Sequence, residues 1–335
     1  MQEVLWNKTF SHIYVEKNIL HHPKTKEILS HFPCCEIIEI ENYKEIFNRK
    51  HQSNSFQYHA QSLILAHKSQ GFVYKGSPVC QSFHEEYFYY CSNVMNCVYD
   101  CEYCFLKGMY GSSNIVVFVN LEDYFLEIES LLKEHPVYVC ASYDTDLFTL
   151  EPYLGIARQW GEFAIKHPDF LLEIRTKGTN IKNIEVLPKK ENCIIACTIS
   201  SEYVQQHYES RTPTVLQRIK LLQELIEDGY SVRLCFDPIL PIGDWKKEYK
   251  ELIEMVVGSI DINKVRDISV GTFRLSKEYL KTMRQQYPLS SLLQYPYVCD
   301  NGFYHLPKEQ EVESYFIKLL ENNGIQKEKI FVWKE

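Results

Sequence analysis

The chain has 335 residues, with 45% hydrophobic and 24% charged residues, twelve cysteines and a formal net charge of −8. The hydrophobic fraction excludes a disordered chain. No apolar run at the start reaches the length of a signal peptide, and none elsewhere reaches the ~20 residues of a membrane helix. We therefore expect a cytoplasmic protein without a membrane partner. Disulfides are rare in the cytoplasm, so the cysteines indicate a metal, a redox role or thiol chemistry, while the acidic charge argues weakly against a nucleic-acid partner.

The first eighty residues predict a short helix over 22–32 and a strand over 36–42. From residue 115 onward, short β-rich runs alternate with helical patterns. The expected strands are 115–119, 137–142, 170–176, 193–200, 231–236 and 268–273. Helices are expected over 121–134 and over 214–229, and the second has Leu216, Ile219, Leu222 and Ile226 at the spacing of one helical face.

Apolar strands separated by amphipathic helices indicate a parallel sheet covered by helices. We therefore predict an α/β protein with a partial (β/α)6 TIM-like barrel, in which active residues gather where strands end. Residues 1–85 are expected to form an N-terminal extension that packs on a barrel of residues 86–335, in one structural unit.

The segment 91–110, CSNVMNCVYDCEYCFLKGMY, carries the clearest chemical signal. Cys97, Cys101 and Cys104 form a C-x3-C-x2-C pattern. A structural zinc site usually takes a second ligand pair, which this region lacks. Three thiolates on an iron–sulfur cube leave one iron without a protein ligand, as a catalytic centre requires. Cys91 is the alternative fourth ligand.

This pattern, with an aromatic residue before its last cysteine, resembles the radical S-adenosylmethionine superfamily. The whole chain resembles the spore photoproduct lyase family, and its clostridial branch more than its bacillus branch. The likeness is carried by the stretches FSHIYVEKNILHHPKTKEIL, CEYCFLKGMYGSSNIVVFVNLED, VCASYDTDL, IRTKGTNI, CTISSEYVQQHYE and CFDPILPIGDW.

The resemblance implies a barrel of the radical-S-adenosylmethionine type and a DNA repair lyase that reverses spore photoproduct, 5-thyminyl-5,6-dihydrothymine, to two thymines. The implied cofactors are a [4Fe–4S] cluster on Cys97, Cys101 and Cys104 and S-adenosyl-L-methionine, which yields a 5′-deoxyadenosyl radical and is regenerated. UV-damaged DNA and an electron donor such as flavodoxin or ferredoxin are the implied partners.

The resemblance also assigns hydrogen-transfer residues. Cys140 matches the bacillus-type cysteine that donates a hydrogen atom to the thymine radical, and Cys80 is the second candidate, through the clostridial branch. Cys140 is the preferred donor, and its alternative interpretation is a buried strand cysteine. Tyr103 matches a tyrosine that returns the hydrogen atom. Phe105 departs from the family, which usually has a second tyrosine there.

Further matched positions concern the S-adenosylmethionine carboxylate. Lys177 and Thr198 match residues that hold it, and an ammonium and a hydroxyl are suitable donors. Ser142 and Asp237 are additional cofactor-binding candidates. A solvated lysine at a strand end is the alternative interpretation of Lys177.

DNA contact rests on two features. Arg274, with Lys277, Lys281 and Arg284, lies at helical spacing, which suits either phosphate contact or an ordinary solvated face. Residues 292–308 predict a hairpin with its turn at Asn301-Gly302, and Phe303 or Tyr304 would stack on bases.

Two other functions stay open. One is a radical enzyme that acts on another nucleic acid or on a small molecule, which the Phe105 departure favours. The other is a non-catalytic zinc- or iron-binding module.

Overall fold

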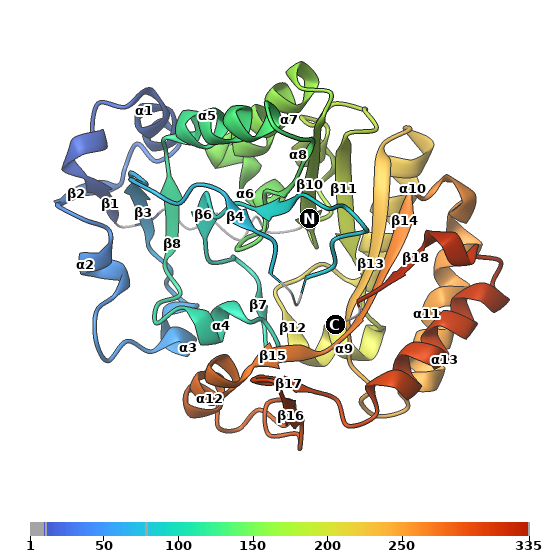
Figure 1. Ribbon diagram of the computed structural model, residues 1–335. Coiled ribbons are helices and arrows are strands. Elements are labelled where there is room, and N and C mark those ends of the chain that lie inside the picture. The colour runs from blue at the N-terminus through green and yellow to red at the C-terminus, as the bar shows by residue number, and fades with distance from the viewer. Residues whose placement is uncertain (1–9, 11, 78–79, 334–335) are drawn as a thin grey trace.

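The computed structural model describes residues 10, 12–77 and 80–333. Its largest sheet curves through the centre and right of the molecule as drawn in Figure 1, and every neighbouring pair in it is parallel except β4 with β5. In spatial order its strands are β18 (Ile330–Val332), β14 (Asp267–Thr272), β13 (Ser231–Ile239), β11 (Cys193–Thr198), β10 (Phe170–Thr176), β9 (Val137–Cys140), β5 (Phe88–Tyr90) and β4 (Tyr74–Lys75).

A second sheet carries the curve onward at the N-terminal side. Its order is β2 (Glu36–Ile40), β1 (His12–Glu16), β3 (Leu63–Ala66), β8 (Ile115–Phe118) and β6 (Val94–Met95). The segment 88–95 joins the two sheets: Cys91 N–H donates to the Cys140 carbonyl beside β9, and Phe118 N–H beside β8 donates to the Asn93 carbonyl. A curled partial barrel is therefore confirmed.

Longer helices cover the outer side of the curve, and short helices lie near its rim (Figure 1). The α-helices are α1 (Pro23–Ser30), α2 (Lys44–Phe47), α3 (Asn54–Gln57), α4 (Leu106–Met109), α5 (Leu121–Leu132), α6 (Leu147–Leu154), α7 (Ile156–Lys166), α8 (Ile181–Ile184), α9 (Glu202–Tyr208), α10 (Val215–Glu227), α11 (Trp245–Ser259), α12 (Lys277–Gln286) and α13 (Glu309–Asn322). Three 3-10 turns lie at Lys17–Ile19, Ile262–Lys264 and Lys327–Lys329. No helix in the described part of the chain is long and apolar enough to cross a membrane.

The expected strands and helices are present, with two corrections. The strand at 115–118 does not pair with the next expected strand, because the segment 88–95 lies between them. Leu216 is 63% exposed. The helix begins at Val215, capped by the Thr214 hydroxyl, so its buried stripe is Val215, Ile219, Leu222 and Ile226.

Two small sheets bind distant segments to the carboxyl edge of the barrel. β7 (Asp100–Cys101) pairs with β12 (Glu209–Ser210), which follows β11 and α9. The predicted hairpin is confirmed: β16 (Val298–Asp300) and β17 (Phe303–His305) pair across Asn301-Gly302, where both residues have positive φ. β15 (Arg274–Ser276) pairs with β17 as well.

Candidate active site

The cluster motif lies on a loop at the carboxyl edge of the barrel. Cys101 belongs to β7, which is paired to the segment after β11, and Cys104 precedes α4. Burial raises the pKa of each of the three thiols, to about 12 for Cys101, and the neighbouring Cys104 and Cys101 raise that of Cys97 further. Backbone N–H groups already face the sulfurs, as Tyr99 N–H donates to Cys97 Sγ at 3.5 Å.

The chemistry of the three thiols fits an iron–sulfur cluster. Among the described residues, no three His, Cys, Asp or Glu side chains lie close enough together to hold a single ion. A four-iron cube meets each thiolate at a different iron, so it suits thiols that are spread around one loop. Cys91 lies beside Cys140, to whose carbonyl its N–H donates at 3.1 Å.

A network of largely buried charged and polar side chains packs against the loop that carries the three cysteines. Lys177 Nζ lies 3.8 Å from Cys101 Sγ, 3.9 Å from Glu209 Oε1 and 5.0 Å from the centre of the Tyr103 ring. Tyr103 donates its hydroxyl hydrogen to Glu209, which also accepts from Arg218 and, at 2.9 Å, from the Ser200 hydroxyl. Although burial opposes ionisation, Lys177 and Arg218 lower the pKa of Glu209 to about 2. Lys177 thus brings a positive charge to the cysteines.

Both candidate hydrogen donors lie at one edge of the barrel. Cys140 ends β9 and is buried. Cys80 comes from the segment before β5, and its Sγ lies 3.5 Å from the hydroxyl of Tyr143, three residues after Cys140. Burial raises the pKa of both thiols, and the charge of Arg175 acts on both in the opposite direction.

Three other predicted cofactor residues have partners within the protein. The Ser142 hydroxyl accepts from Arg175 N–H at 2.6 Å. Thr198 ends β11, and its carbonyl accepts from Arg218 at 3.3 Å. Asp237 accepts from both terminal nitrogens of Arg274 at 3.2 Å and lies 3.9 Å from Arg175 Nη1. Asp237 therefore fixes two arginine side chains at the strand ends.

The structure corrects the expectation that Arg274, Lys277, Lys281 and Arg284 form one helical face. The Ser276 hydroxyl caps α12, so this helix begins at Lys277, and Arg274 lies in strand β15 before it. The guanidinium of Arg274 is bonded to Asp237 and stacked 4.7 Å from the Trp333 ring. Arg284 is held as well, because it donates to the Leu293 and Tyr295 carbonyls at 2.6 and 3.0 Å. Lys277 and Lys281 remain exposed.

The two aromatic residues of the hairpin face opposite ways. Tyr304 pairs with Leu275, a core residue that is 4% exposed, whereas Phe303 pairs with Ser276 and Asp300. Cross-strand partners share a face, and successive residues of a strand alternate between faces. Phe303 is therefore on the face away from the core.

Comparisons with known proteins show the family of the chain. The family model for spore photoproduct lyase matches residues 9–295. The chain belongs to the spore photoproduct lyase family. A family member from Clostridium acetobutylicum is 25% identical over 255 residues, 73% of each chain, and one from a Geobacillus species is 21% identical over 202 residues, 58% of this chain and 59% of that one.

Solved structures of the family share the fold. Spore photoproduct lyase complexed with dinucleoside spore photoproduct has a TM-score of 0.82 and 18% sequence identity, over 98% of this chain and 99% of the other. A mutant lyase with bound S-adenosylmethionine and dinucleoside spore photoproduct has a TM-score of 0.79 over the same shares, at 18% identity. The fold of the whole described chain is therefore that of the family.

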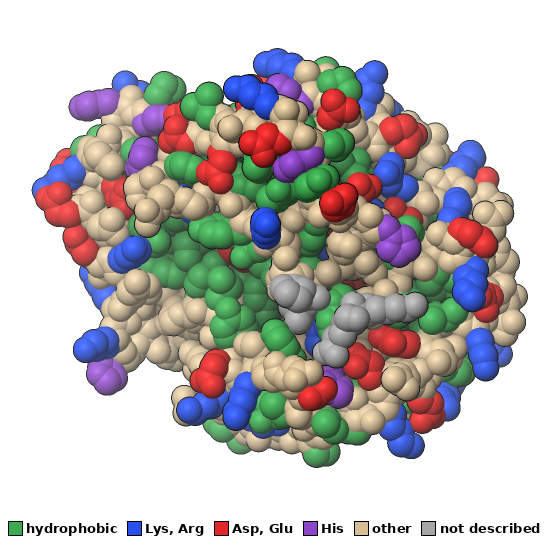
Figure 2. Space-filling model, viewed as in Figure 1, with side chains coloured by type: hydrophobic (Ala, Val, Ile, Leu, Met, Phe, Trp, Pro, Cys, Tyr) green, Lys and Arg blue, Asp and Glu red, His purple; other side chains and the backbone are tan. Residues whose placement is uncertain are grey.

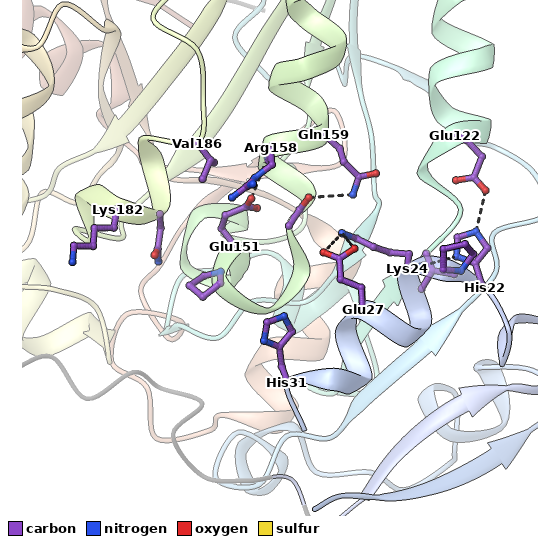
Figure 3. Close-up of a pocket in the computed structure, with 15 residues that line it drawn as sticks. His22, Lys24, Glu27, His31, Glu122, Glu151, Arg158, Gln159, Lys182 and Val186 are labelled. Atoms are coloured by element: carbon purple, nitrogen blue, oxygen red, sulfur yellow. Dashed lines mark hydrogen bonds and ion pairs between the residues drawn. The ribbon is translucent and has the colours of Figure 1, made fainter. Parts of the chain in front are cut away.

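A cavity of about 800 Å³ lies elsewhere on this family fold, between α1, α6, α7 and α8 (Figure 3). Its lining includes Lys24, Glu27, Glu151 and Arg158, and it contains none of the cluster cysteines. Lys24 donates to Glu27, and Glu151 accepts from two backbone N–H groups of α7. These polar groups are therefore paired locally, Lys24 with Glu27 inside α1 and Glu151 with the first turn of α7.

Sequence reasoning missed several residues of the site. Glu209, Arg175 and Tyr143 were all within or beside stretches that carry the family likeness, but no spacing rule relates them to the cysteines. The sequence signals for two of them are an arginine within the apolar 170–176 strand and a glutamate soon after the 193–200 strand, because a charged residue in or beside a buried strand usually has a partner.

Proposed function

We propose that this chain is a DNA repair lyase that converts spore photoproduct to two thymines with a [4Fe–4S] cluster and S-adenosyl-L-methionine. The observation that carries the proposal is the C-x3-C-x2-C loop beside the half-buried Lys177 at the carboxyl edge of the family's barrel. Damaged DNA is the substrate, and flavodoxin or ferredoxin in the cytoplasm is the proposed electron donor.

Bound together, the cluster and S-adenosylmethionine supply a carbon-centred radical that removes a hydrogen atom from the lesion. Cys97, Cys101 and Cys104 would hold the cluster, and their raised pKa values mean that cluster binding releases protons. The Lys177 ammonium and the Thr198 hydroxyl would bind the carboxylate of S-adenosylmethionine, with Ser142 and Asp237 ordering the two arginine-bearing strand ends around it.

The barrel edge also sets the access of the lesion. Figure 2 shows a hollow on this face with hydrophobic side chains in it and charged side chains around its rim. An extruded thymine dimer suits such a lining, at an unstacking cost of a few kcal/mol. Cys140 and Cys80 both lie at this edge, and either thiol would give its hydrogen atom to the product radical.

The direct test is anaerobic reconstitution with iron and sulfide, followed by reduction and addition of S-adenosylmethionine and dinucleotide spore photoproduct. We expect thymidylyl-thymidine as the product. An intact, reducible cluster that yields no such product would contradict the lyase function and favour a radical enzyme with another substrate.

Metal analysis tests the remaining alternative. We expect about four irons per chain and a brown colour, both lost in Cys101→Ala but kept in Cys91→Ala. One zinc per chain, without iron, would instead indicate a structural metal module.

A further inference from the structure

Tyr143 is a half-buried tyrosine at the barrel edge to which no sequence pattern assigned a role. It follows β9, and its ring stacks on Tyr90 at 4.1 Å between centroids and contacts Phe105 at 5.4 Å. Tyr90 in turn stacks on Tyr74 at 5.2 Å. The ring of Tyr143 is therefore fixed from two sides, and its hydroxyl oxygen accepts a hydrogen bond from the Cys80 thiol at 3.5 Å.

We propose that Cys80 and Tyr143 form the hydrogen-transfer pair of this enzyme, an inference that rests on the proposed function. Tyr143 would supply the phenol hydroxyl that Phe105 lacks. Position 105 follows the last cluster cysteine, and its side chain carries no O–H hydrogen. The ring of Tyr143 lies against that side chain and brings a hydroxyl from another loop to the same place.

The pair works through two balanced transfers. The Cys80 S–H bond breaks as a C–H bond forms on the thymine radical, which leaves a sulfur radical. The Tyr143 O–H bond then breaks as the S–H bond forms again, which leaves a phenoxyl radical. A third transfer restores the pair: a C–H bond of 5′-deoxyadenosine, which holds the hydrogen atom first taken from the lesion, would break as the Tyr143 O–H bond forms again, so no external reductant is consumed.

The pair favours Cys80 over Cys140 as the direct donor. A thiol that must be restored in each turnover needs an O–H group beside it, and Tyr143 meets this need for Cys80. Cys80 also lies among the charges of Arg274, Arg175 and Asp237, which places it at the ends of β10, β13 and β15.

Tyr143→Phe tests the pair, because it removes the hydroxyl and keeps the stacked ring. Tyr90→Phe is the matched control from the same stack. In the wild type, 5′-deoxyadenosine release is expected to be well below one per lesion repaired. We expect Tyr143→Phe to raise this ratio several-fold toward one and Tyr90→Phe to leave it unchanged. An unchanged ratio in Tyr143→Phe overturns the pair.

A second measurement uses the protein without cluster or substrate. A phenol that donates a hydrogen bond to a thiolate stabilises the thiolate, which is the form that reacts with iodoacetamide. Tyr143→Phe should therefore slow the alkylation of Cys80 several-fold at pH 8, and Tyr90→Phe should leave it unchanged. Peptide mass spectrometry follows the reaction. Equal rates in Tyr143→Phe and wild type overturn the Cys80–Tyr143 contact. If the wild-type protein yields no thymidylyl-thymidine, the proposed function is overturned, and this outcome is seen before any variant is compared with the wild type.

Discussion

Glu209 is the residue on which the charges behind the cluster loop depend. Its carboxylate accepts from Tyr103, Ser200 and Arg218 and faces Lys177, and all five side chains are buried or nearly so. Such a carboxylate neutralises cations that have lost their water, and its removal leaves them uncompensated.

Glu209→Gln is therefore expected to lower the free energy of unfolding by roughly 3–5 kcal/mol, since Arg218 stays buried without its counter-charge. Urea unfolding of the cluster-free protein at pH 7 measures this loss. The control is Glu202→Gln, at an exposed position of α9, where a change within about 0.5 kcal/mol is expected. Equal stability of the two variants would contradict a structural role for Glu209.

At the scale of elements, the α6–α7 junction holds a carboxyl group that titrates near neutrality. Burial raises the pKa of Glu151 to about 7, against the opposing effect of the Ala157 and Arg158 N–H groups, which donate at 2.7 and 3.2 Å. Figure 3 shows this carboxyl beside Arg158. Because the folded-state pKa exceeds the unfolded value of 4.5, the folded state binds more protons between pH 4.5 and 7.

Stability is thus expected to fall as pH rises through that window, by up to about 3 kcal/mol from this group. Glu151→Gln cannot ionise, so the difference in unfolding free energy between pH 5 and pH 8 should shrink, although one hydrogen bond of the junction is lost. Urea titrations at both pH values compare it with the wild type. A variant with the same pH dependence as the wild type would exclude Glu151 as its source.

The hairpin β16–β17 is the element proposed to contact DNA. Its successive side chains alternate between two faces, so Phe303 and Tyr304 have different roles. Phe303 shares a face with Asp300 and Ser276, whereas Tyr304 shares one with buried Leu275 and lies 5.6 Å from the Arg284 guanidinium. Only Phe303 is then positioned to stack on a base.

Phe303→Ala should weaken binding of lesion-containing duplex DNA by about 1–3 kcal/mol, the usual value of one base–aromatic stack, with little change in Tm. Tyr304→Ala should show the reverse, a lower Tm and a smaller loss of affinity. Fluorescence anisotropy and thermal unfolding separate these outcomes. A greater loss of affinity in Tyr304→Ala at unchanged Tm would reverse the assignment.

At the scale of the whole molecule, residues 1–85 supply part of the curled sheet. β3 is buried along its whole length and pairs with β8, and β1 and β2 continue the sheet beyond it. We propose that the extension and the barrel fold as one unit.

A fragment of residues 86–335 is accordingly expected to be insoluble or to lack fixed tertiary packing. It would expose one edge of β8 and the core side chains that β3 covers. Each large apolar side chain so exposed loses about 1.5–3 kcal/mol of burial free energy. Near-UV circular dichroism and gel filtration against the full chain test this. A soluble, cooperatively unfolding fragment would show that the extension is dispensable.

The sequence by itself determined the local features of this protein. The period of its apolar residues predicted the strands from 115 onward and helices α5 and α10, and the turn at Asn301-Gly302 predicted the hairpin. The cysteine spacing predicts the loop proposed to hold the cluster, since Cys97, Cys101 and Cys104 lie within eight consecutive residues. Net charge said little, because any DNA contact rests on one hairpin and two exposed lysines.

Tertiary structure alone decided which distant residues meet. β5 and β6 have only three and two residues, too few to show a period, yet they lie between β9 and β8 and lead into the cluster loop. Asp237 holds Arg274, 37 residues away, and Tyr143 meets Cys80, 63 residues away. Such contacts depend on how strands curve and pack rather than on spacing along the chain, and they form the parts of the site that sequence reasoning missed.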